Sequence, residues 1–175
     1  MNQSDRNNQN NKVSDIDTMM EEIQKQIVED EKTIYSNKVI ELYTTALNFG
    51  MMEDADVFAA IKGWCGDTMV MYLRVKEGKI EESSFYTDGC GATLAAGSML
   101  TIMAKGKSLE EARNITEEDL LDALDGLPDE HQHCAALSVN TLRKAISDFF
   151  KDGGPTILEN KEVAKQINLE KRDEP

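Results

Sequence analysis

The stretch DTMVMYLRVKEGKIEESSFYTDGCG, residues 67–91, predicts the fold of this chain. Between residues 67 and 75 the side chains alternate, which is the period of a β-strand with one covered face. Residues 76–79 supply a turn, and residues 80–87 return as a second strand. The apolar side chains that define the covered face of the first strand are Met69, Met71, Leu73 and Val75. We therefore expect an antiparallel β-hairpin.

The sequence on either side of the hairpin predicts an α+β fold. Residues 57–62 (VFAAIK) predict a further strand, which makes a small three-stranded antiparallel sheet. Residues 92–104 are mostly small or apolar and predict a buried helix, and apolar residues at helical spacing predict a last core helix over residues 134–150. Ser108 and Thr116, each followed by acidic residues, mark the starts of two short helices. We expect the helices to pack on one face of the sheet.

Composition divides the chain into three parts. Residues 1–31 are a polar amino-terminal extension, in which apolar residues at helical spacing allow an amphipathic helix over residues 16–30. Residues 32–151 carry the apolar patterns of a folded domain that opens with a helix over residues 33–48. Residues 152–175 are a highly charged carboxy-terminal tail. A core of about 110 to 130 residues is large enough to fold alone.

The charge balance argues against several classes of partner. The chain has 19 Lys and Arg against 33 Asp and Glu, a net charge of −14, which repels the phosphate backbone of nucleic acids. No apolar run approaches the roughly 20 residues that span a bilayer, and the first residues lack the apolar stretch of a secretory signal. Cysteines without such a signal indicate the reducing cytoplasm. We expect a cytoplasmic protein that binds neither nucleic acid nor membrane.

The three cysteines lie in the phrases Cys65-Gly66-Asp67, Gly89-Cys90-Gly91 and His133-Cys134. An odd number of cysteines leaves at least one thiol outside any internal disulfide. With Asp67 and His133 the phrases supply three thiolates, one carboxylate and one imidazole. A [2Fe–2S] cluster and a structural zinc ion each need four protein ligands. The count therefore admits both, with either Asp67 or His133 as the fourth ligand.

The settings of the two later cysteines favour thiolates, and the carboxylate of Asp67 favours a site that gives up its metal. Cys90 lies at a strand-to-helix turn, where backbone N–H groups and the positive helix end favour a thiolate. Cys134 begins a helix beside His133, a setting that lowers the pKa of a thiol. Asp67 offers a hard oxygen that is poorly matched to iron held among sulfides, so a site that includes it binds a cluster less firmly than four thiolates do. His131 could substitute for His133.

Together these motifs resemble those of the U-type iron–sulfur cluster assembly scaffolds, the IscU and NifU amino-terminal group. Cys-Gly-Asp is followed by Gly-Cys-Gly 25 residues on and by His-Cys 44 residues after that. The resemblance covers roughly residues 33–150 and implies the α+β fold of that family. Beyond the ligands, the segments that resemble the family are Tyr35–Ile40, Phe85–Gly91 and Lys105–Ala112.

The resemblance implies a scaffold and not an enzyme. Sulfur from a cysteine desulfurase and iron would be assembled on it into a transient [2Fe–2S] cluster for transfer to apo iron–sulfur proteins. Cys65, Cys90 and Cys134 would be cluster ligands, with Asp67 and His133 as exchangeable or supporting groups. Cys134 would also be the persulfide acceptor, and zinc would occupy the same ligands when no cluster is present. The resemblance also allows a homodimer.

Two observations bear on the partners and on a rival function. Where bacterial relatives carry Leu-Pro-Pro-Val-Lys for a dedicated Hsp70-type chaperone, this chain has Leu127-Pro128-Asp129-Glu130-His131, and the two acidic residues count against that contact. The rival is a zinc-containing, sulfurtransferase-like persulfide relay. That branch carries an insertion between the second and third cysteines, so the spacing of 44 residues counts against it.

Overall fold

The computed structural model describes residues 16, 18–20, 22, 23, 25, 26 and 29–152. The chain forms two compact units, Met1–Tyr35 and Ser36–Pro175. In the first unit the described residues up to Ile34 are helical. The helix predicted over residues 16–30 lies partly outside the described residues, and the charged tail lies outside them except for Asp152. The predicted domain boundaries therefore stay predictions.

The second unit contains the predicted strands and core helices. Strand β1 has the predicted bounds, and β2, β3 and α3 agree with them to within one residue at each end. Helix α6 is longer than predicted by two residues at each end. Among the described residues, no helix is long and apolar enough to cross a membrane. In chain order the elements are α2 (Asn37–Thr45), β1 (Val57–Lys62), β2 (Thr68–Lys76), β3 (Lys79–Thr87), α3 (Gly91–Ala104), α4 (Leu109–Arg113), α5 (Glu117–Ala123), a 3-10 turn (Asp129–His131) and α6 (Gln132–Asp152).

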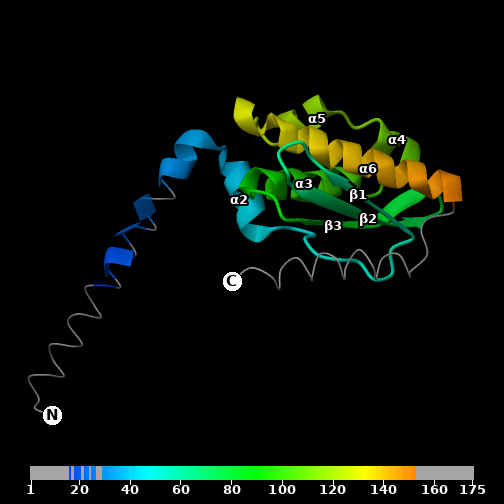
Figure 1. The fold of residues 1–175 in the computed structure, drawn as a ribbon, viewed down its shortest axis with the longest axis horizontal. Helices are drawn as coiled ribbons and strands as arrows, with labels where there is room; N and C mark the ends of the chain where they lie inside the picture. Colours follow the sequence, from blue (N-terminus) through cyan, green and yellow to red (C-terminus); the bar gives the residue numbers. More distant parts are fainter. Residues whose placement is uncertain (1–15, 17, 21, 24, 27–28, 153–175) are drawn as a thin grey trace, which may run out of the picture. The chain divides into compact units, whose positions relative to one another are not determined.

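The strands form one antiparallel sheet in the order β1-β2-β3. Phe58 of β1 lies opposite Tyr72 of β2, and Tyr72 lies opposite Ser84 of β3. Helix α6 packs on β1 and β2, α3 packs on β3, and the two helices pack against each other, so they cover the same face (Figure 1). The predicted α+β fold, with helices on one face of a small three-stranded antiparallel sheet, is confirmed.

The main core lies between these helices and the sheet. Small residues of α3 allow a close approach to β3: a Cβ built on Gly97 would lie 2.4 Å from the ring of Phe85. Because protein interiors are packed as densely as organic crystals, this contact leaves no room for a larger side chain. Large side chains that are fully buried include Met69, Met71, Leu73, Phe85, Leu100, Leu142 and Ile146.

The opposite face of the sheet carries a second, smaller apolar cluster. Phe58 and Tyr72 stack there with ring centroids 5.9 Å apart, next to Val70. Ala55 and Met52 also belong to this cluster, so the loop before β1 packs on this face. The alternation along β2 placed Tyr72 on the face opposite Met69 and Met71, but only one covered face was expected, so this second cluster was not predicted.

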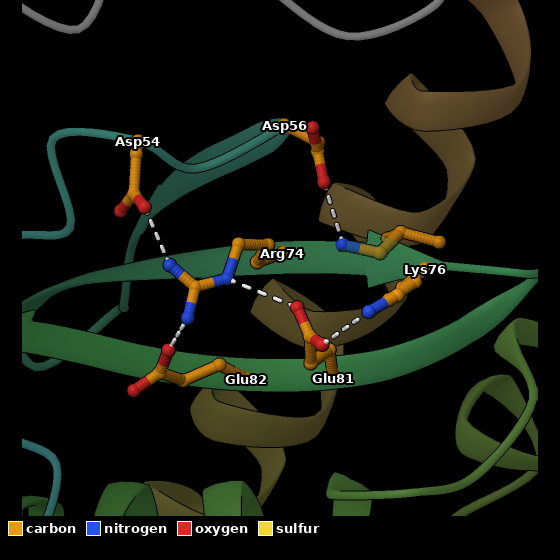
Figure 2. A network of polar contacts seen from close by, with 7 residues as sticks. Asp54, Asp56, Arg74, Lys76, Glu81 and Glu82 are labelled. Carbon is orange, nitrogen blue, oxygen red and sulfur yellow. Dashed lines mark hydrogen bonds and ion pairs between the residues drawn. The ribbon is translucent and has the colours of Figure 1, made fainter.

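Arg74 ties that loop to the sheet (Figure 2). Its guanidinium pairs with the carboxylates of Asp54, in the loop before β1, and of Glu81 and Glu82 in β3. Asp56 in the same loop accepts a hydrogen bond from the backbone N–H of Val75, at 2.6 Å. Because these groups are partly exposed to water, each ion pair adds only about 0–1 kcal/mol to stability. Their effect is to fix the position of the loop.

The free edge of β3 is covered by two other segments. The N–H of Phe85 donates to the C=O of Asn48 (3.0 Å), and the N–H of Gly50 donates to the C=O of Phe85 (2.7 Å). Near the other end of the strand, Ile80 exchanges hydrogen bonds with residues 106–107. A covered edge offers no template for pairing with another chain.

The prediction of one helix over residues 33–48 is wrong at both ends. Ser36 has an extended backbone, and its hydroxyl accepts a hydrogen bond from the N–H of Val39 and donates one to the C=O of Leu124 (2.7 Å). Helix α2 therefore begins only after Ser36. It ends at Thr45 because Ala46 adopts the left-handed conformation, with φ 44°.

The starts predicted for the two short helices are confirmed. Ser108 caps α4 and accepts a hydrogen bond from the N–H of Glu111, whose carboxylate accepts one from the N–H of Ser108. Thr116 and Asp119 form the same reciprocal pair at the start of α5. Each capping box satisfies backbone N–H groups that a short helix would otherwise leave unpaired.

Candidate metal and cluster site

Cys65 and Asp67 lie in a tight turn between β1 and β2. The N–H of Gly63 donates to the C=O of Asp67 (2.7 Å), and the N–H of Gly66 donates to the C=O of Gly63 (3.1 Å). A Cβ on Gly63 would lie 3.4 Å from the Cys65 sulfur and 3.3 Å from the side chain of Leu137, so the turn packs closely against α6. The Cys65 thiol itself is exposed.

Cys90 is the N-cap residue of α3, at the strand-to-helix turn that the sequence predicted. Its side chain caps no backbone group of the helix, and its thiol is exposed. The backbone N–H groups of Ala92 and Thr93, in the first turn of the helix, nevertheless help to lower the pKa of its thiol. This arrangement favours a thiolate, because the first N–H groups of a helix have no partners within the helix.

Cys134 lies in the first turn of α6 and is fully buried. Its sulfur is 3.7 Å from Nε2 of His133. The imidazole of His133 packs on the indole of Trp64, with ring centroids 4.9 Å apart. Because Trp64 precedes Cys65, this ring pair links the turn that carries Cys65 to the start of α6.

A threonine that the sequence motifs did not single out lies among these groups. Thr93, in the first turn of α3, is fully buried. Its Oγ1 lies 3.1 Å from Oδ2 of Asp67, 3.3 Å from Sγ of Cys134 and 3.6 Å from Sγ of Cys90. Candidate ligands from three separate segments therefore meet at one hydroxyl. The signal that could have found Thr93 is its position three residues after Cys90, on the same side of a helix.

The thiols of Cys90 and Cys134 differ in pKa. Interaction with the Cys134 side chain, aided by Thr93 and by the N–H of Ala92, lowers the pKa of Cys90 to about 4. The same interaction, together with burial, raises the pKa of the Cys134 thiol well above its ordinary value. The expectation that the helix start and His133 lower the pKa of Cys134 is therefore wrong. These pKa shifts favour the thiolate form of Cys90 and the neutral thiol of Cys134.

The structure gathers most of the predicted ligands but leaves one apart. Asp67, Cys90 and Cys134 meet at Thr93, and His133 adjoins Cys134. Cys65 is exposed, and its thiol forms no hydrogen bond with the residues that the structure describes. Within that part of the chain, no three His, Cys, Asp or Glu side chains already form a metal site. Binding of a metal therefore requires the ligands to move closer together.

His131, which the sequence offered only as a substitute ligand, lies near the site. Its Nδ1 is 3.9 Å from Sγ of Cys90, whereas His133 contacts Cys134 instead. The ring centroids of the two histidines are 6.5 Å apart. Cys90 therefore has the imidazole of His131 beside it, and Cys134 has that of His133.

The fold and this site define the chain as a small α+β domain whose thiols, carboxylate and imidazoles converge from separate turns and helix starts. A family model described as the NifU-like N terminal domain matches residues 34–154. The chain belongs to this family, as its motifs indicated.

Curated relatives match most of the chain. The iron-sulfur cluster assembly scaffold protein IscU 1 of Archaeoglobus fulgidus is 42% identical over 141 residues, which are 80% of this chain and 92% of the relative. The iron-sulfur cluster assembly scaffold protein IscU of Escherichia coli (strain K12) is 38% identical over 120 residues, which are 66% of this chain and 93% of that protein. Both relatives are named as scaffold proteins, not as enzymes.

Solved structures share the fold at low sequence identity. The amino-terminal part of a NifU-like protein from Brucella abortus aligns with a TM-score of 0.54 at 17% identity, covering 68% of this chain and 96% of its own. A putative iron-sulfur cluster assembly scaffold protein for the SUF system from Fervidobacterium islandicum AW-1 aligns with a TM-score of 0.56 at 21% identity, covering 65% and 97%. At these identities the likeness supports the fold alone.

Proposed function

We propose that this chain is a scaffold for iron–sulfur cluster assembly, which holds a transient [2Fe–2S] cluster and passes it to apo iron–sulfur proteins. The observation that carries the proposal is the meeting of the Cys90 and Cys134 thiols with the Asp67 carboxylate at Thr93. Soft thiolates beside one hard oxygen suit iron that is bound and later given up. Membership of a family whose curated relatives are named as scaffolds supports it.

Cys65, Cys90 and Cys134 supply the thiolates in this proposal, and Asp67 or His133 supplies the fourth ligand. Since the Cys65 thiol is exposed while Cys134 is buried, closure of the turn that carries Cys65 completes the set. Zinc takes the same ligands in the cluster-free form, because thiolate, imidazole and carboxylate donors in fours suit tetrahedral zinc.

Sulfur comes from a cysteine desulfurase in this proposal. Once the start of α6 has opened and the Cys134 thiol has released its proton to solvent, its thiolate attacks the outer sulfur of the desulfurase persulfide, the sulfur–sulfur bond of the donor breaks, and the desulfurase cysteine leaves as a thiolate. Because Cys134 is fully buried, the start of α6 must open before this step. The desulfurase and the apo-proteins are cytoplasmic partners, and the net charge of −14 suits basic surfaces on them.

Anaerobic reconstitution tests the proposal. The chain is incubated with ferrous iron, cysteine, a thiol reductant such as dithiothreitol and a catalytic amount of desulfurase, and it is followed by visible absorption and Mössbauer spectroscopy. We expect a [2Fe–2S] cluster that moves to an apo-ferredoxin, and we expect Cys90→Ser to abolish it while the variant stays folded. A persulfide relay predicts instead that no visible cluster forms, that zinc stays bound and that desulfurase turnover rises. That result would reject the scaffold.

A further inference from the structure

Thr93 is not one of the candidate metal ligands, yet its hydroxyl contacts three of them. The residue is fully buried, so water does not compete for its hydroxyl. A carboxylate only accepts hydrogen bonds, so across the 3.1 Å between Oγ1 and Oδ2 of Asp67 the threonine must be the donor. Among the described residues, no other side chain forms a hydrogen bond with the Asp67 carboxylate.

The single proton of this hydroxyl has one preferred acceptor. A carboxylate is a stronger acceptor than a thiol sulfur, and Oδ2 of Asp67 is also nearer to Oγ1, at 3.1 Å, than Sγ of Cys134 is, at 3.3 Å. The sulfur of Cys90 is farther from Oγ1, at 3.6 Å. The hydroxyl therefore donates chiefly to Asp67, and Sγ of Cys134 is its second, more distant acceptor.

The absence of a side chain at Gly89 leaves space for the hydrogen bond between Thr93 and Asp67. A Cβ at Gly89 would lie 2.6 Å from Oδ2 of Asp67 and 2.8 Å from Oγ1 of Thr93, closer than non-bonded atoms approach. The backbone of Gly89 is not in the left-handed region, so space and not conformation explains the glycine. Asp67 in the turn after β1, Gly89 before α3 and Thr93 in the first turn of α3 therefore pack closely around the Asp67 carboxylate.

We propose that Thr93 is a positioning residue for the metal centre: its hydroxyl holds one oxygen of Asp67 and leaves the other free for a metal bound by Cys90 and Cys134. The inference rests on the proposed function for the identity of the site and adds a residue that acts through Asp67. Hydrogen-bond partners of ligating carboxylates commonly matter about 10–100-fold for metal affinity.

Titration of the metal-free chain with Co²⁺ tests this role, because thiolate-to-cobalt and d–d absorption bands report both affinity and ligand type. Thr93→Val keeps the branched shape and removes the hydroxyl, whereas Thr93→Ser keeps the hydroxyl. We expect Thr93→Val to bind Co²⁺ about 10–100-fold more weakly than the wild-type chain, with altered d–d bands, and Thr93→Ser to stay within about threefold. Thermal unfolding of each metal-free variant shows whether it is folded.

A double variant that includes Asp67→Ala tests whether Thr93 acts on the metal through Asp67. If Thr93 acts through Asp67, adding Thr93→Val to Asp67→Ala leaves the Co²⁺ affinity unchanged. The proposal is overturned if the two effects add in full, or if Thr93→Val alone binds Co²⁺ like the wild-type chain. Absence of thiolate–cobalt bands in the wild-type chain would instead remove the metal site and the proposed function with it.

Gly89→Ala keeps the test decisive if Thr93→Val does not fold. Its Cβ displaces the Asp67 carboxylate from Thr93 and leaves every candidate ligand in the chain. We expect weaker Co²⁺ binding in the same range of about 10–100-fold, and only while Asp67 is present. Unchanged binding by this variant overturns the proposal.

Discussion

Cys90 and Cys134 shift each other's pKa, but of the two a reagent in solution can reach only Cys90. Cys90 is exposed and its pKa is lowered to about 4, whereas Cys134 is fully buried and its pKa is raised. A lowered pKa keeps the reactive thiolate populated as the pH falls, until about pH 4. We therefore expect iodoacetamide to alkylate Cys90 of the native metal-free protein at a nearly constant rate from about pH 6 to pH 8, and to spare Cys134.

Timed alkylation followed by peptide mass spectrometry measures both rates. Cys134→Ala is the matched control, because it removes the hydrogen bond that contributes most to the lowered pKa of Cys90. In that variant the rate at Cys90 should fall as the solution becomes more acidic. A wild-type rate that climbs about tenfold per pH unit from roughly pH 6 upward would contradict the assignment of the thiolate to Cys90.

At the same scale, the residues that sequence reasoning found are those whose chemistry is evident from their type. Cysteine, histidine and aspartate in short phrases are candidate ligands wherever they stand. Thr93 could not be found in this way, because a threonine near a helix start usually caps or packs. The pKa of Cys134 was predicted in the wrong direction because burial and the neighbouring Cys90 are tertiary facts.

Between elements, the contact of α3 with β3 depends on Gly97. Alanine in place of an exposed helical glycine usually stabilises a helix, by about 0.5–1 kcal/mol. Here the added Cβ would lie 2.4 Å from the Phe85 ring, so the helix or the strand must shift. We expect Gly97→Ala to lower the free energy of unfolding by about 1–3 kcal/mol, measured by urea denaturation of the metal-free chain.

Ile102→Ala on the same helix serves as the control, because this side chain is 45% exposed and its loss leaves the contact with β3 unchanged. A further variant, Gly97→Ala with Phe85→Leu, should recover part of the lost stability, since the smaller side chain frees space. Stabilisation by Gly97→Ala alone would show that α3 does not pack on Phe85 as described.

The elements themselves were predictable where a local pattern is repeated. The alternation in β2 and the capping residues at Ser108 and Thr116 act within a few residues, and the structure confirms those elements. The predicted helix over residues 33–48 fails at Ser36, because Ser36 binds the carbonyl of Leu124, which is 88 residues away. The covering of the β3 edge was missed for the same reason, since irregular segments form it through backbone hydrogen bonds.

Across the second unit, the core and the candidate site use different parts of the elements. Fully buried apolar residues come from the middle of the sheet and from the helices that cover it, such as Leu73, Leu100 and Ile146. The candidate ligands lie instead in one turn and at two helix starts. We therefore expect the folded state not to depend on a metal to hold its elements together, unlike a small domain whose folding energy comes from zinc.

This separation predicts the response of the whole molecule to metal removal. We expect the chain to keep its far-UV circular dichroism and a cooperative thermal transition after treatment with a chelator and dialysis. Zinc at 100 times its dissociation constant should then stabilise the folded state by about 2.7 kcal/mol, seen as a rise of several degrees in the transition midpoint. Cys90→Ser is the control, because it should unfold cooperatively without metal and lose most of the zinc-dependent rise. If the chelated wild-type chain shows no cooperative transition, the metal is structural. The ligands then hold the fold together and do not release a bound metal or cluster.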